Sequence, residues 1–214
     1  MSAASSSGAE GEHLLRRGVT LEVGTLAWNA VGVVVLGVLA LSARSVALLG
    51  FGLDSLVEIG ASVVVLWELR GVGADRERRA LALIAVAFAT IALYLGGQST
   101  WDLTEGIHAR HSPGGIVWTA VTALVMFALA RGKDRVGRAT ARDVLVREGR
   151  VTFVDGLLAV AILLGLSLNA VTGAWWADPA ATFVIVGYGV REAVEITRSL
   201  RPPRQRPPAD SPPR

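Results

Sequence analysis

The chain has 214 residues, 52% of them hydrophobic, and a mean hydropathy of +0.49. This composition is too apolar for an ordinary soluble domain, so we predict an integral protein of the lipid bilayer. The chain has no cysteine, which excludes disulfides, thiolate metal sites and a catalytic cysteine. Its 21 Lys and Arg residues outnumber its 18 Asp and Glu residues, which gives a net charge of +3. This basicity by itself would also suit a protein that binds nucleic acid or anionic lipid.

The first part of the chain is polar and the next part is apolar. Residues 1–18 are rich in Ser, Gly and charged residues, so we predict that they are disordered or lie at the membrane interface. The run 23–41 has no charged residue and is long enough to span a bilayer. Asn29 lies within this run, and its amide could form a hydrogen bond to another helix.

The second apolar run, 45–67, carries two acids near its middle, Asp54 and Glu58. Their spacing of four residues places both side chains on one face of a helix. An ionised acid near the bilayer centre costs about 2.5 to 3.5 kcal/mol on insertion scales, so the pair should face water, a partner or a cation. The central turns of the predicted spans contain no basic residue, which favours a diffusible cation over pairing with buried arginines or a hydrated crevice.

The rest of the chain predicts four further spans and a tail. The connector before the fourth span contains His108 and His111, which would reach one metal if helical, although loop histidines are more commonly solvated. The fifth span carries a single acid, Asp155, near its start.

Residues 201–214 are rich in Pro and Arg and are predicted to be a disordered tail. We therefore expect an all-α fold, a six-helix transmembrane bundle over residues 19–200. The last four predicted spans are 80–101, 116–130, 151–177 and 180–196.

The distribution of basic residues predicts the topology. With six spans, every Lys and Arg lies on one side of the membrane except Arg44 and Arg110. The positive-inside rule then places both termini in the cytoplasm. The basicity is accounted for by topology, so we do not expect nucleic acid as a partner. The excess of arginine over lysine and the abundant Ala and Gly suggest a prokaryotic protein of the plasma membrane.

The second and fifth spans run in opposite directions, which brings Glu58 and Asp155 to a comparable depth. Asp54, Glu58 and Asp155 would form an oxygen-rich site for a divalent cation, with Asn29 and Thr152 as possible auxiliary ligands. An alternative is an intramembrane aspartyl protease in which Asp54 and Asp155 share a proton. Such proteases resemble one another in a GxGD segment, whereas the segment here is GFGLD and no tyrosine precedes Asp155. We therefore do not expect an enzyme.

The motifs of these two spans resemble those of the cation diffusion facilitator family, antiporters that exchange divalent metals for protons. The stretch SARSVALLGFGLDSLVEIG places Asp54 and Glu58 at the positions of that family's acid pair. The stretch VTFVDGLLAVAILLGLSLN places Asp155 at its fifth-span aspartate, and the family-like WADP follows. The resemblance implies a secondary transporter that exports a divalent metal from the cytoplasm through these three carboxylates.

Two departures from the family pattern qualify what the resemblance implies. Val151 stands where the family has a histidine or an acid, and no cytoplasmic metal-binding domain follows the sixth span. With no histidine in the site, protons would be carried by the carboxylates, and Mn²⁺, Fe²⁺ or Mg²⁺ would be favoured over Zn²⁺. The pattern does not decide which of Mn²⁺, Fe²⁺, Zn²⁺, Co²⁺ or Mg²⁺ is the substrate. The alternative is a degenerate member that no longer transports and acts as a metal-binding or partner membrane protein. The sequence is compatible with a homodimer.

Overall fold

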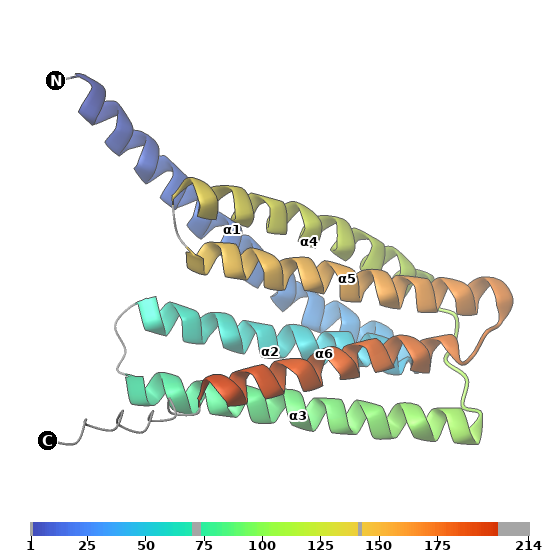
Figure 1. Cartoon of the computed structure of the whole chain (residues 1–214). Helices are drawn as coiled ribbons and strands as arrows, with labels where there is room; N and C mark the ends of the chain where they lie inside the picture. The colour runs from blue at the N-terminus through green and yellow to red at the C-terminus, as the bar shows by residue number, and fades with distance from the viewer. Residues whose placement is uncertain (1, 70–73, 141–142, 201–214) are drawn as a thin grey trace, which may run out of the picture.

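The computed structural model describes residues 2–69, 74–140 and 143–200, and within these residues it contains six α-helices and no strand. Figure 1 shows an elongated bundle in which most helices run side by side, while α1 crosses the others obliquely and projects beyond them at its N-terminal end. The predicted all-α, six-helix membrane bundle is confirmed. The helices are α1 (Ser2–Ala43), α2 (Val46–Leu69), α3 (Ala74–Glu105), α4 (Pro113–Ala139), α5 (Asp143–Thr172) and α6 (Ala177–Ser199).

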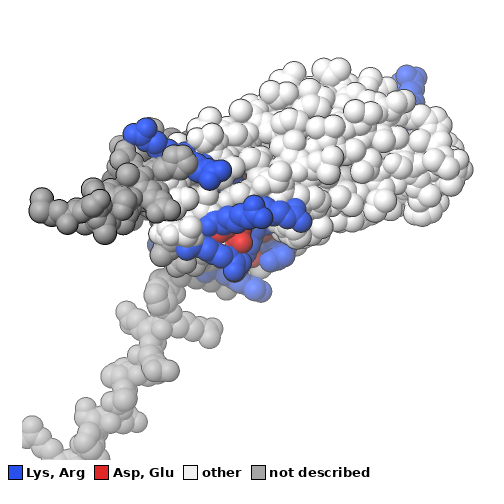
Figure 2. All heavy atoms as spheres, turned by 90° about the horizontal axis from the view of Figure 1, so that it is seen from above, with Lys and Arg blue, Asp and Glu red and all other residues white. Residues whose placement is uncertain are grey.

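The outside of the bundle is apolar over most of its length. Large hydrophobic side chains such as Val34, Leu93 and Leu124 are exposed to the surroundings, as lipid-facing residues are. Figure 2 shows a largely uncharged body on one face, with Lys and Arg gathered toward one end. By length and composition, four described segments could cross a membrane: Arg16–Ala43, Leu81–Glu105, Pro113–Ala139 and Glu148–Thr172.

The first helix begins earlier than its predicted apolar span. Helix α1 begins at Ser2, so residues 2–18 are helical rather than disordered. Their Ala, Leu, Glu and Arg residues favour helix, and a span that is already helical supplies the nucleus from which the helix extends. Their position at the membrane interface stays a prediction. The predicted tail, 201–214, lies outside the described residues.

The long charged segment between the fourth and fifth predicted spans is also largely helical. Helix α4 continues past residue 130 to Ala139, and α5 begins at Asp143 rather than at residue 151. The two helices therefore extend by two or more turns beyond their apolar runs. This extension brings charged side chains of the segment against α1, with consequences for the site described below.

The core lies where α1, α2, α5 and α6 meet. Its largest fully buried apolar side chains include Leu36, Leu48 and Ile162. Helices α5 and α6 approach closely at Gly165, where an added Cβ would lie 2.8 Å from Ala181 Cβ. Only glycine permits this approach, and such small-residue contacts are typical of helix packing in membranes. The tight packing fixes the position of α5, the helix that carries Asp155.

The start of α2 is held by a carboxylate from another helix. Asp178, in the first turn of α6, is buried and accepts hydrogen bonds from the Ser45 hydroxyl and from the backbone N–H groups of Val46 (3.0 Å) and Ala47 (3.3 Å). The first N–H groups of a helix have no partner within the helix, so Asp178 caps α2 from outside. The cap fixes how far α2 slides along α6, and with it the depth of the acids on α2.

Replacing Asp178 with Ala should therefore destabilise the protein strongly. The change leaves three buried donors without an acceptor, and each such group costs about 1 to 3 kcal/mol. We expect a lower melting temperature for the purified protein in detergent, followed by tryptophan fluorescence, and a smaller drop for Asp178→Asn, which keeps one acceptor. Asp134→Ala is the matched control, because that acid is partly exposed and pairs with Arg138 on the surface. Equal melting of Asp178→Ala and wild type would contradict the capping role.

Candidate metal site

The three acids singled out by the sequence converge in the bundle. Asp54 and Glu58 extend from α2 and Asp155 from α5, and one carboxylate oxygen of each lies within 4.8 Å of the others. All three residues are buried, with exposed fractions of 4%, 8% and 3%. The spacing of four residues on α2 and the packing of α2 beside α5 produce this arrangement, as the sequence predicted.

The carboxylates have few protein partners. Among the described residues, no ion pair joins any of the three to a lysine or arginine. Glu58 Oε1 and Asp155 Oδ1 are buried and accept no hydrogen bond. A buried, unpaired carboxylate is costly, so the cluster requires protons or a bound cation to offset its charge.

Asn29 of α1 contributes the hydrogen bond across helices that the sequence predicted. Its side-chain Nδ2 donates to Glu58 Oε2 at 3.0 Å, and both residues are buried. This bond orients the Glu58 carboxylate and leaves Oε1 free to accept a proton or a cation. Asn29 therefore positions an acid of the cluster, and a direct role as a ligand stays a prediction.

Thr152 lies one turn before Asp155 on α5, but its hydroxyl is engaged elsewhere. It donates to the backbone carbonyl of Glu148 at 2.9 Å and accepts from Lys133 Nζ at 3.1 Å. The predicted auxiliary role of Thr152 toward a cation stays untested, and the observed contacts link it to Lys133.

Among the residues that the structure describes, no imidazole joins the three acids. Val151, four residues before Asp155, has a side chain that is 39% exposed and offers no ligand atom. His108 stacks on Trp175, with ring centroids 5.2 Å apart, in the connections that precede α4 and α6. The metal-capable group found in the described part of the chain consists of carboxylates alone. The chemistry of this donor set is that of hard, oxygen-seeking cations.

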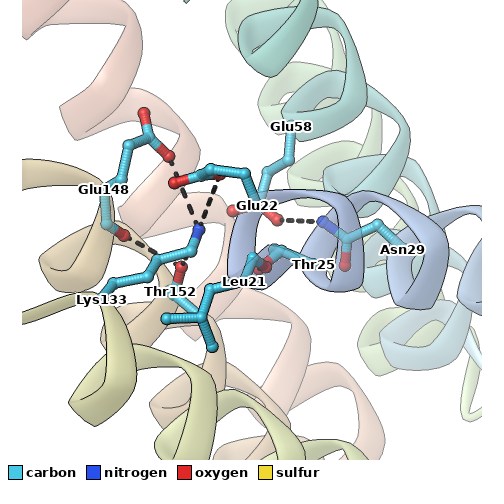
Figure 3. Close-up of polar contacts among 8 residues, drawn as sticks. All are labelled: Leu21, Glu22, Thr25, Asn29, Glu58, Lys133, Glu148 and Thr152. Carbon is cyan, nitrogen blue, oxygen red and sulfur yellow. Dashed lines mark hydrogen bonds and ion pairs between the residues drawn. The ribbon is translucent and has the colours of Figure 1, made fainter. Parts of the chain in front are cut away.

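One residue beside the site was not expected from the sequence. Lys133 belongs to the long charged segment between the fourth and fifth predicted spans, yet it is fully buried on α4. Its ammonium lies 3.0 Å from Glu22 Oε2 and 4.0 Å from Glu148 Oε2 (Figure 3). The signal available in the sequence is that Lys133 is the only lysine among 21 basic residues.

Comparison with known proteins decides the family. The model of the cation efflux transmembrane domain matches residues 24–201. The chain belongs to the cation efflux family. A curated relative is Transmembrane protein 163 of Xenopus laevis, which is 21% identical over 166 residues that cover 72% of this chain and 58% of the relative. The chain thus spans less than two thirds of that relative's length.

Family membership agrees with the predicted class of protein, because the cation efflux family comprises membrane transporters of cations. Asp54, Glu58, Asp155 and Asn29 all fall within the matched residues. The buried carboxylates are thus part of the transmembrane domain that defines the family.

Proposed function

We propose that the chain exchanges a divalent metal cation for protons through a carboxylate site formed by Asp54, Glu58 and Asp155. The observation that carries this proposal is the convergence of three buried acids from two helices, with ligand oxygens within 4.8 Å of one another. Family membership supplies the substrate class, metal cations. The absence of a basic partner in the described ion pairs supplies the need for a mobile cation.

Charge balance indicates how the exchange proceeds. A cluster of three ionised carboxylates carries a charge of −3, and either one divalent cation or two protons brings it to −1. The loaded and protonated sites then have the same charge, so neither adds an electrostatic penalty when the site changes the side to which it opens. A metal entering from one side displaces protons, and protons arriving from the other side displace the metal. Asn29 holds Glu58 in place during both steps.

The charge distribution of the sequence supports a direction. Both termini lie on the side that carries nearly all Lys and Arg, which the positive-inside rule identifies as the cytoplasm. In a prokaryotic plasma membrane the proton gradient is directed inward, so an antiporter would export metal. The substrate side of the site during export is then the side of the α4–α5 connection.

The test is transport by the purified chain in proteoliposomes that contain a pH-sensitive dye. Adding Mn²⁺ outside should cause Mn²⁺ uptake together with alkalinisation of the lumen, because protons leave as metal enters. Vesicles without protein are the control for leakage. Metal uptake with no change in lumenal pH, measured with the membrane potential clamped, would contradict proton exchange.

The second candidate is a family member that binds metal without transporting it. It is favoured by Val151, which leaves the site with three protein carboxylates and no histidine. Mn²⁺ would then raise the melting temperature of the protein, while the proteoliposomes would show neither metal uptake nor a change in pH. The same two measurements therefore distinguish both candidates.

A further inference from the structure

A second cluster of charged side chains lies near the acid site. Lys133, on α4, is fully buried, and its ammonium contacts Glu22 of α1 and Glu148 and Thr152 of α5. Figure 3 shows these side chains pointing toward one another, with the Glu58–Asn29 hydrogen bond in the same view. We refer to Lys133, Glu22 and Glu148 as the lysine triad.

The lysine triad is an incompletely satisfied arrangement. One ammonium faces two carboxylates, so a negative charge remains when all three are ionised. Glu22 Oε1 is buried and accepts no hydrogen bond. The Glu22 and Glu148 side chains are 26% and 24% exposed, whereas the Lys133 side chain is 1% exposed. The acids therefore reach the edge of the bundle, and the ammonium is the part that lies inside.

The triad and the acid site share the same helix faces. Glu22 lies seven residues before Asn29 on α1, and Glu148 lies seven residues before Asp155 on α5. Seven residues are two turns, or about 10.5 Å along a helix, and residues so spaced lie on one face. Lys133 bonds to Thr152, only three residues before Asp155. The ammonium thus occupies the level between the outer acids and the site acids.

We propose that Lys133 is a gate residue, whose ammonium closes α1 against α4 and α5 and must release Glu22 before a cation passes between this end of the bundle and the acid site. The gate rests on the proposed transport function. Its contacts join three helices, α1 through Glu22 and α5 through Glu148 and Thr152. While they hold, the ammonium occupies the place beside Glu22 that an approaching divalent cation would take.

Opening follows from the same contacts. When the ammonium leaves Glu22, the ion pair between α1 and α4 is lost and the Glu22 carboxylate faces an incoming cation without its partner. The negative charge that remains on the triad then attracts the cation. Small changes in such ion pairs are a common way to hold one of two arrangements of packed helices.

The gate is tested by measuring access to a position between the two levels. Thr25 lies on α1 between Glu22 and Asn29 and is buried, with only a local hydrogen bond to the Leu21 carbonyl. Because the chain has no cysteine, Thr25→Cys introduces a single thiol. Its reaction with a positively charged methanethiosulfonate should be slow in detergent and accelerate about tenfold when Lys133→Met removes the ammonium. Glu22→Gln, which removes only the α1 partner, should also accelerate it.

Two controls separate a gate from general loosening of the fold. Ser99→Cys places a thiol at a buried position near the far end of α3, and its labelling should not change when Lys133 becomes Met. Arg135→Met removes an exposed positive charge of the same helix and should leave labelling at Thr25→Cys unchanged. Equal acceleration at both thiols, or none at Thr25→Cys with either triad variant, would overturn the gate. Labelling needs no metal, so a failure of transport would leave this result independent.

Discussion

The Asp155→Asn protein should insert and fold normally but lose metal-driven proton exchange. Asparagine keeps the shape of the side chain but cannot take up a proton and is a weaker ligand than a carboxylate. Because Asp54, Glu58 and Asp155 have ligand oxygens within 4.8 Å of one another, losing one changes the charge of the whole site. We expect Mn²⁺ affinity to fall by at least about tenfold, or roughly 1.4 kcal/mol, and flux to fall to the level of protein-free vesicles.

The same variant should not lose stability. Asp155 Oδ1 is buried without a hydrogen-bond partner, so neutralising this residue removes a cost of the metal-free fold. The melting temperature of metal-free Asp155→Asn should equal or exceed that of wild type, while the Mn²⁺-induced rise in melting temperature should disappear. Loss of function without loss of stability identifies residues retained for activity rather than for packing.

Asp134→Asn serves as the matched control for this experiment. Asp134 is a partly exposed acid of α4 that pairs with Arg138 on the surface, so the change removes the same charge away from the site. Flux should be unaffected. Glu58→Gln and Asp54→Asn should behave like Asp155→Asn if the three act together. Undiminished flux in Asp155→Ala would show that the acids do not form one site.

The acid site could be predicted because its signal is local. In an apolar span, Asp54, Glu58 and Asp155 stand out as single charges that lipid would not tolerate, and the helical period decides which share a face. Asn29 stands out in the same way. Antiparallel spans then bring α2 and α5 to matching depth, so the convergence of the acids follows from counting residues.

Lys133 could not be predicted because its environment is set by distant residues. It lies in a segment rich in charged residues, a composition that predicts exposure to water. Its burial depends on α4 and α5 extending beyond their apolar runs and on Glu22, 111 residues away in the chain. The cap formed by Asp178 on α2 is hidden for the same reason, since its partners are 131 to 133 residues away.

The wild-type site should prefer Mn²⁺ to Zn²⁺, and Val151→His should reverse or reduce that preference by at least about tenfold. Zinc sites in proteins usually draw on imidazole or thiolate, and the acid cluster contains neither. Val151 lies four residues before Asp155 on α5, which places an introduced histidine on nearly the same face of the helix. The side chain of Val151 is exposed, so the larger ring can be accommodated without displacing core residues.

Competition binding of Mn²⁺ and Zn²⁺ to purified wild type and variant measures the change, and pH supplies a second readout. A protonated imidazole cannot bind a metal, so the Zn²⁺ affinity gained by Val151→His should decline below about pH 6.5, the ordinary histidine value. Leu157→His is the control, because it adds the same ring to an exposed position on a different face of α5 and should leave the preference unchanged. A wild-type preference for Zn²⁺ of more than about tenfold would show that three carboxylates do not make this site selective for hard ions, and that water or backbone carbonyls determine its selectivity instead.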